Sequence, residues 1–286
     1  MTVAQSTTKE VLVGVDWARQ HLDDANVRFV EVDVDTSAYD TGHLPGAVAL
    51  NWTTQLNDPV KRDLVSRDEL QELLRAAGIS DDTLIVLYGD NNNWFAAWAY
   101  WQLRYNGVDN VRLLDGGRKK LEAEGLPLTT EAPSHERGNI TLSGQTREEI
   151  RAYRDEVVSG IGAGGRGLVD VRSPEEYRGE LAAPAHLPQE AAQRKGHIPS
   201  AVNVPWGTAV AEDGTFKPPD QLREIYGSKG ITPDKEIVAY CRIGERSSHT
   251  WFVLSEILGY PTVRNYDGSW TEYGSLVGVP IDTGER

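Results

Sequence analysis

The strongest constraint on the fold is that this chain of 286 residues repeats itself. Three pairs of tracts recur in the same order in both halves. They are TGHLPGAVALNW (41–52) with KGHIPSAVNVPW (195–206), ISDDTLIVLYGD (79–90) with ITPDKEIVAYCR (231–242), and GVDNVRLLDGG (107–117) with GYPTVRNYDGS (259–269). Each copy spans about 140 residues, which is the size of a domain and far above the size of a solenoid repeat. We therefore expect a duplicated domain.

The polar stretch TTEAPSHERGN (129–139) lies between the copies and has the composition of a linker. It predicts an N-terminal domain over residues 1–135 and a C-terminal domain over residues 136–286. The second copy is longer because an additional segment occupies residues 179–195.

Within each copy, short apolar runs alternate with amphipathic segments. LIVLY (84–88) and EIVAY (236–240) are typical of buried strands in a parallel sheet. Helices are expected over 93–107 and 247–258, each ending at a glycine, and two further helices over 66–78 and 219–230. The alternation predicts an α/β fold in which each domain is a parallel sheet flanked by helices.

The only cysteine, Cys241, directly follows the strand expected over 236–240. Reactive groups in such sheets lie just beyond the carboxyl ends of the strands. Gly244 allows a tight loop over 241–246, and Ser247 is the expected N-cap of the next helix. Converging loop amides and a helix N-terminus would lower the pKa of the thiol and stabilise an anion on the sulfur. The alternative is that Cys241 is a small buried packing residue.

Comparison of the two copies separates residues that hold the fold from residues that can carry chemistry. Five positions differ in a consistent way, and in each pair the first-copy residue is given first. They are Gly89 and Cys241, Asp90 and Arg242, Trp94 and Arg246, Asp35 and Arg172, and Asp40 and Arg178. We infer that the second copy binds an anion beside the sulfur, whereas the first is a scaffold. For Arg178 a solvated surface position is an equal alternative.

The same comparison of the two copies argues against a catalytic role for several other residues. The two copies share His43 with His197, Asp33 with Asp170, and Asp115 with Asp267. Because the copy without a cysteine keeps these residues, they are expected to pin turns and loops. His249 is expected to be a half-exposed helix residue, and Trp206 to be a packing residue.

Composition argues against several classes of partner and site. A formal net charge of −14 argues against nucleic acid and anionic membranes. A single cysteine excludes an intramolecular disulfide and a cysteine-cluster metal site. The N-terminal residues lack the pattern of a signal peptide, and no run approaches the roughly 18 apolar residues of a membrane span, so a cytoplasmic location is expected.

In VDVRSPEEYRGE (169–180), KGHIPSAVNVPW (195–206), VAYCRIGERSS (238–248) and DGSW (267–270), the chain resembles the rhodanese family of sulfurtransferases, in particular its tandem-domain members. The resemblance implies an inactive first domain, an active second domain, and a site facing the cleft between them. It implies a ping-pong reaction through a cysteine persulfide on Cys241. The six-residue loop would comprise Cys241, Arg242, Ile243, Gly244, Glu245 and Arg246, with Ser247 following it.

The resemblance also indicates the substrates. Arg242 matches thiosulfate-type tandem enzymes, whereas the 3-mercaptopyruvate type usually has glycine there. Ile243 and Glu176 depart from the thiosulfate type, in which lysine or arginine can occupy these positions, and Arg246 resembles single-domain bacterial members. Thiosulfate is therefore the favoured donor and mercaptopyruvate the alternative. Arg246, Arg242, Arg172 and Arg178 would hold the sulfonate oxygens, a thiol or cyanide would accept the sulfur, and no metal or organic cofactor is needed.

Two alternative functions are compatible with a similar cysteine loop or with the same fold. Phosphatases and arsenate reductases with a C-x5-R loop also cradle an anion beside a cysteine, but the spacing from Cys241 to Arg246 is C-x4-R, which encloses a smaller site. The other rival is a non-catalytic sulfur-carrier or protein-binding module with the same fold.

Overall fold

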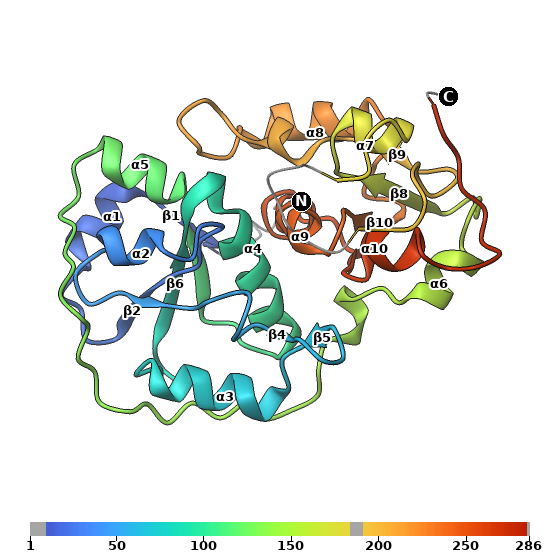
Figure 1. Cartoon of the computed structure of the whole chain (residues 1–286). Helices are drawn as coiled ribbons and strands as arrows, with labels where there is room; N and C mark the ends of the chain where they lie inside the picture. Colours follow the sequence, from blue (N-terminus) through green and yellow to red (C-terminus); the bar gives the residue numbers. More distant parts are fainter. Residues whose placement is uncertain (1–9, 184–190, 285–286) are drawn as a thin grey trace, which may run out of the picture.

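The computed structural model of the protein describes residues 10–183 and 191–284 and shows two α/β domains side by side (Figure 1). The strands of the first domain are β1 (Leu12–Val13), β2 (Val27–Glu31), β3 (Val48–Ala49), β4 (Asn57–Asp58), β5 (Asp63–Leu64), β6 (Leu84–Tyr88) and β7 (Val111–Leu114). Its helices are α1 (Val15–Gln20), α2 (Ala38–Thr41), α3 (Arg67–Ala76), α4 (Asp90–Tyr105) and α5 (Gly117–Ala123).

The central sheet of the first domain is parallel, with the strand order β1-β7-β6-β2-β3. Helices α1 and α5 cover one face, where Ala18 and Leu121 enter the core. Helices α3 and α4 cover the other, where Leu74 and Phe95 are buried. Strands β4 and β5 form a separate antiparallel hairpin outside this sheet.

The second domain repeats the plan. Its strands are β8 (Arg166–Asp170), β9 (Val202–Asn203), β10 (Glu236–Tyr240) and β11 (Val263–Tyr266). Its helical elements are η1 (Glu148–Ile150), α6 (Arg154–Ser159), α7 (Pro174–Arg178), η2 (Trp206–Ala209), α8 (Pro219–Gly227), α9 (Glu245–Phe252), η3 (Val253–Ile257) and α10 (Ser269–Tyr273).

The sheet of the second domain is also parallel, in the order β11-β10-β8-β9. Val157 of α6 and Trp270 of α10 pack on one face, and Leu222 of α8 and Phe252 of α9 on the other. The duplicated α/β fold expected from the sequence is therefore confirmed. The two glycines expected to follow helices, Gly107 and Gly259, have the positive φ values of 87° and 68° that such positions favour.

The domains share one apolar core, formed where α4 packs against α9. The Tyr100 ring meets Phe252 edge-on at 4.8 Å, and its hydroxyl donates to Glu256 Oε2 at 3.0 Å. Trp94 at the start of regular α4 lies 5.2 Å from Trp206, measured between ring centroids. This packing fixes the first domain next to the loop that carries Cys241.

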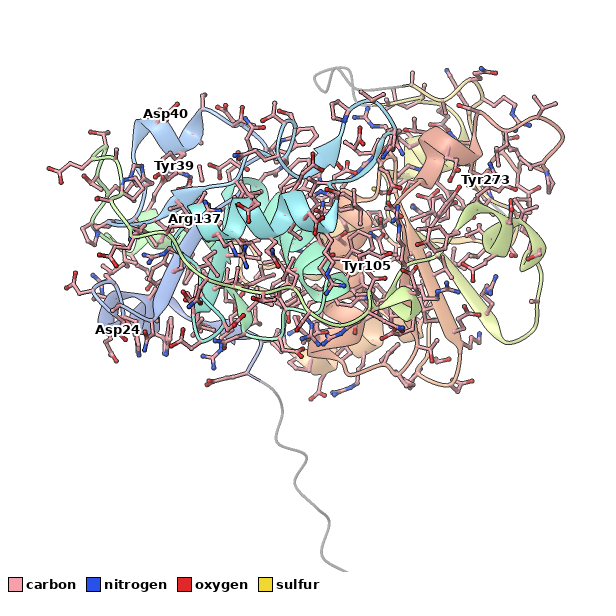
Figure 2. The ribbon with its side chains drawn as sticks, turned by 90° about the horizontal axis from the view of Figure 1, so that it is seen from below. Asp24, Tyr39, Asp40, Tyr105, Arg137 and Tyr273 are labelled. Carbon is pink, nitrogen blue, oxygen red and sulfur yellow. The ribbon has the colours of Figure 1, made fainter. Side chains whose placement is uncertain are left out.

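The segment expected to be a linker lies against the first domain. Thr129 pairs with His43, and His135 Nε2 lies 2.8 Å from the Gly46 carbonyl oxygen. Arg137, which is labelled in Figure 2, forms an ion pair with Glu72 of α3. The boundary expected between residues 135 and 136 stays a prediction.

Candidate active site

Cys241 directly follows β10 at its carboxyl end, on the short loop that leads to α9, as the sequence predicted. Gly244 is the N-cap of α9 and has φ 102°, a conformation that favours glycine. A Cβ at this position would also come within 2.6 Å of Asp267 Cα. In this conformation the Gly244 amide donates to Cys241 Sγ at 3.1 Å. One of the expected hydrogen bonds from loop amides to the sulfur is therefore present.

Ser247 does not have the expected role of N-cap, because α9 begins at Glu245, two residues earlier. Its hydroxyl instead donates to Asn265 Oδ1 at 2.6 Å, and Asn265 Nδ2 donates to the Gly244 carbonyl at 3.1 Å. These bonds attach the loop to β11 and hold Gly244 in place.

The protonation state of Cys241 differs from the expectation. Burial raises the pKa of the Cys241 thiol, and the Glu245 carboxylate adds to that rise; the Arg246 guanidinium and the Ser247 amide oppose it without reversing it. The prediction of a lowered thiol pKa is therefore wrong for this structure, because Sγ is completely buried with a carboxylate beside it. The thiol donates to Glu245 Oε2 at 3.3 Å.

Arg246 lies at the loop as predicted, but it is bound to a carboxylate. Its Nη1 and Nη2 atoms donate to Glu176 of α7 at 2.8 and 3.1 Å, and its Cζ lies 5.7 Å from the centroid of the Trp94 ring in the first domain. Both members of the pair are buried. Arg246 is thus a buried cation whose partner Glu176 comes from another element.

Arg242 is also buried beside the sulfur, and burial lowers the pKa of its guanidinium. Its carbonyl accepts from the backbone amide of Thr271 at 2.9 Å, which fixes the loop against α10. Ile243 is half-buried on the same loop.

The other two predicted arginines are held elsewhere. Arg172 donates to Asp170 at 2.6 Å and to the Gly196 carbonyl at 2.7 Å, with its Cζ 4.5 Å from the centroid of the Trp270 ring. Arg178 pairs with Glu180 at 2.7 Å and with Glu175 at 3.8 Å. These contacts give Arg172 a structural position and tie Arg178 to local carboxylates, so we leave both out of the proposed anion site.

A pocket of about 310 Å³ lies between the domains at the loop. Its lining from the second domain is Ile243, Glu245 and Asp267, and Glu245 is the lining residue that contacts Sγ. The first domain contributes aromatic rings and the β4–β5 hairpin: Trp52, Thr53, Asn57, Asp58, Pro59, Arg62, Asp63, Phe95 and Trp98. Sequence comparison missed the hairpin because the pairing of the domains brings it to the site.

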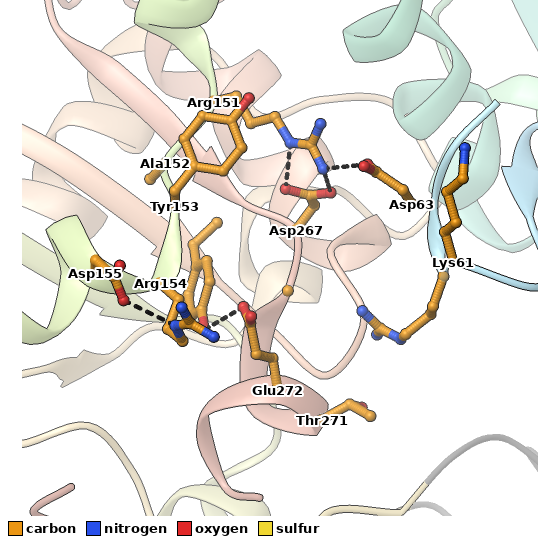
Figure 3. Close-up of a pocket in the computed structure, with 13 residues that line it drawn as sticks. Lys61, Asp63, Arg151, Ala152, Tyr153, Arg154, Asp155, Asp267, Thr271 and Glu272 are labelled. Atoms are coloured by element: carbon orange, nitrogen blue, oxygen red, sulfur yellow. Dashed lines mark hydrogen bonds and ion pairs between the residues drawn. The ribbon is translucent and has the colours of Figure 1, made fainter. Parts of the chain in front are cut away.

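A second pocket, drawn in Figure 3, has a volume of about 490 Å³. It adjoins the first pocket, because Arg62, Asp63 and Asp267 line both. Within it Arg151 donates to Asp267 at 2.8 and 2.9 Å and to Asp63 of the hairpin at 2.6 Å. Arg151 thereby joins Asp63 of the first domain to Asp267, which packs against Gly244. The sequence indicated the pinning role of Asp267 but gave no signal for Arg151.

The residues shared by the two copies have the structural roles that the sequence predicted. His43 and His197 stack on Tyr39 and Tyr177 with ring centroids 3.7 Å apart in each pair. His249 is not half-exposed as expected. It is fully buried between Trp206 and Phe216, and burial lowers its pKa to about 3, so it is neutral at physiological pH.

The equivalent loop of the first domain is closed by its own contacts. Gly89 is extended, and its amide donates to Asn93 Oδ1 at 3.0 Å. Asp90 accepts from the amides of Val34 and Asp35 at 2.6 and 3.0 Å. A Cβ on Gly89 would collide with the carbonyl oxygen of Val32, so a cysteine does not fit at this position.

Replacing Gly89 with cysteine should therefore lower the free energy of unfolding by about 1–3 kcal/mol without creating a second reactive loop. Urea denaturation measures the first effect, and counting the sulfurs gained after incubation with a donor measures the second. Gly207→Cys is the matched control because a Cβ there has open space. A stable Gly89→Cys protein that binds a second sulfur would contradict this account.

In the residues that the structure describes, no group of three or more His, Cys, Asp or Glu side chains is arranged to hold a metal ion. Within the same residues, no helix has both the length and the apolar character needed to cross a membrane.

A cysteine on a glycine-containing loop between a parallel strand and a helix, in the second of two duplicated domains, defines the site of a rhodanese-type protein. The rhodanese-like domain matches residues 14–124 and 153–276. The chain belongs to the rhodanese family. The transferase class predicted from the sequence agrees with that family.

Relatives and solved structures cover nearly the whole chain. A protein of Saccharopolyspora erythraea, provisionally named thiosulfate sulfurtransferase, is 58% identical over 275 residues, which are 96% of each chain. The sulfur carrier protein TtuD of Thermus thermophilus is 56% identical over 280 residues, 97% of this chain and 98% of its own. EanB, solved as a cysteine persulfide with ergothioneine, has a TM-score of 0.85 at 25% identity and covers 100% of this chain and 73% of its own.

Proposed function

We propose that the protein transfers the sulfane sulfur of thiosulfate to a thiol or cyanide through a persulfide on Cys241. The Cys241 sulfur, once deprotonated, attacks the outer sulfur of thiosulfate. The new Sγ–S bond forms as the S–S bond of thiosulfate breaks, and its electron pair leaves with sulfite. The acceptor then attacks the outer sulfur of the persulfide, and Cys241 leaves as a thiolate.

The observation that carries this proposal is the geometry at Cys241. Its sulfur lies at the N-terminal end of α9, receives the Gly244 amide hydrogen bond at 3.1 Å, and has Arg242 and Arg246 beside it. The fixed amide donor and the two nearby guanidinium charges stabilise negative charge that develops on the sulfur during the reaction, even though burial raises the pKa of the resting thiol. Arg62 adds a further cation to the lining of the adjacent pocket.

The choice of thiosulfate as the sulfur donor rests on the residue that follows Cys241. A buried guanidinium at position 242 favours a dianionic donor such as thiosulfate over 3-mercaptopyruvate, which carries a single carboxylate. The provisional names of several relatives support the same choice.

We expect Arg242→Gly to slow persulfide formation from thiosulfate at least about 10-fold more than formation from mercaptopyruvate, because a charge-assisted hydrogen bond is lost mainly with the dianion. Single-turnover rates with both donors measure this. The parent protein should prefer thiosulfate. If Arg242→Gly lost the same factor in rate with both donors, Arg242 would not be a residue that selects thiosulfate. If the parent protein preferred mercaptopyruvate, the choice of donor would be reversed.

The name of the Thermus relative favours a second possibility, in which the persulfide is handed to a protein and small thiols are poor acceptors. Multiple turnovers with cyanide or a small thiol would favour the enzyme. A stoichiometric persulfide that small acceptors do not discharge would favour the carrier. Rapid Cys241-dependent hydrolysis of a small aryl phosphate would instead support the phosphatase alternative.

A further inference from the structure

The Glu245 side chain lies directly against the reactive sulfur. It is 1% exposed, and its Oε2 accepts the thiol hydrogen bond at 3.3 Å. Its Oε1 has no hydrogen-bond partner among the residues that the structure describes and lies 4.0 Å from Arg246 Nε. A carboxylate with one oxygen on a thiol and the other unsatisfied is an unusual arrangement, because a buried charge needs compensation.

Arg246, whose Nε lies 4.0 Å from Glu245 Oε1, does not supply that compensation in full. Arg246 directs both terminal nitrogens at Glu176, not at Glu245. Glu245 therefore combines three features: it is buried, its Oε1 has no hydrogen-bond partner in the described part of the chain, and it both contacts Sγ and lines the pocket between the domains. Such a carboxylate can accept a proton from the thiol and become a neutral, easily buried acid.

The duplication offers an independent comparison. Asn93 occupies the position of Glu245 in the first copy, where Gly89 replaces the cysteine. Both ends of its side-chain amide hold the loop, since Oδ1 accepts from the Gly89 amide and Nδ2 donates to the Leu114 carbonyl at 2.7 Å. A carboxylate thus occurs at this position in the copy that has the thiol, and an amide in the copy that lacks it.

We propose that Glu245 is the general base and acid of the sulfur-transfer reaction. This role rests on the proposed function. As Sγ attacks the donor, its proton passes to Glu245 Oε2, so that thiol, carboxylate and thiosulfate become a persulfide anion, a carboxylic acid and sulfite. When the acceptor removes the outer sulfur, Glu245 returns the proton to the departing thiolate, which restores the starting pair. No outside oxidant or proton donor is needed for this balance.

His249 is unsuited to the same task, because burial lowers its pKa to about 3, which makes it a weak base, and its ring nitrogens have no hydrogen-bond partner in the described part of the chain. Other charged groups lie around the Cys241–Glu245 pair. They are Glu176 of α7, Arg242 and Arg246 of the loop and α9, Asp267 after β11, and Asp58, Arg62 and Asp63 of the β4–β5 hairpin.

The test is the pH profile of persulfide formation in Glu245→Gln. In the parent protein the proton moves within the pair, so the rate should be nearly independent of pH on the acid side of neutrality. In the variant the thiol must lose its proton to water, so the rate should fall tenfold for each unit below the pKa of the thiol. Because the ordinary pKa of a cysteine is about 8.5 and burial raises it here, the variant should be at least about 300-fold slower at pH 6. At high pH it should regain most of the parent rate.

Three further measurements separate the possible failures. Glu224→Gln, an exposed change on α8, should keep the parent profile. Formate should partly restore Glu245→Ala through the pocket. Alkylation of Cys241 by iodoacetamide should show the same pH dependence, and it reports on Glu245 even if thiosulfate is not the donor. A variant as fast as the parent at pH 6, or slowed equally at every pH without formate rescue, would overturn the role of Glu245. A parent protein that alkylates as expected but takes sulfur from neither donor would overturn the proposed function alone.

Discussion

Cys241→Ser should eliminate sulfur transfer from thiosulfate to cyanide or a thiol, with a loss of at least about 1,000-fold. The chain contains no second cysteine that could carry the sulfur. A serine hydroxyl does not ionise under these conditions and cannot form the corresponding persulfide. Steady-state assays with thiosulfate and each acceptor measure the effect.

The loss should be purely chemical. Serine is close in size to cysteine, and the Gly244 amide that donates to Sγ can donate to a hydroxyl oxygen in its place. The urea midpoint of the variant should therefore stay near that of the parent. Transfer by Cys241→Ser at more than about a tenth of the parent rate would mean that the sulfur travels without Cys241.

Arg246→Ala should destabilise the protein by about 3–5 kcal/mol, because it leaves the Glu176 carboxylate buried without its cation. Burial alone would raise the pKa of Glu176, but Arg246 and, less strongly, Arg172 hold it below its usual range. A carboxylate whose pKa is lowered by folding stabilises the protein above its unfolded pKa and loses that contribution as the pH falls. The cost of Arg246→Ala, measured by urea denaturation, should therefore be largest near neutral pH and should shrink below about pH 4.

Two variants control for the removal of the side chain itself. Arg246→Ala combined with Glu176→Gln should recover part of the lost stability, because no buried charge remains unpaired. Arg246→Lys keeps the charge but not the two parallel hydrogen bonds, so its cost should be intermediate. A loss below about 1 kcal/mol for Arg246→Ala at neutral pH would show that the pair does not hold α7 to α9.

The fold followed from features that are local in the sequence. The apolar runs ending at Tyr88 and Tyr240 have the length and β-branched character of buried parallel strands, and both became central strands. The place of Cys241 followed from the same argument, because the end of a strand and the start of a helix are both visible in the order of residues.

The contacts between distant segments were not visible in this way. Arg172 and Arg246 are both predicted to hold the sulfonate oxygens, yet Arg172 is bound to its near neighbour Asp170. Arg246 is bound to Glu176, 70 residues away in the chain, and only the packing of α7 brings this pair together. The raised pKa of Cys241 has the same origin, since it depends on complete burial and on the rotamer of Glu245. The start of α9 was expected at Ser247, too late in the sequence, because the helix is capped by Gly244 and not by a hydroxyl side chain.

The most direct test of the central claim is the intact mass of the protein after incubation with thiosulfate. We predict a gain of one sulfur atom that maps to the peptide containing Cys241, disappears on addition of cyanide, and is absent in Cys241→Ser. A parent protein that gains no sulfur from thiosulfate or mercaptopyruvate, or a serine variant that gains it equally, would contradict the account.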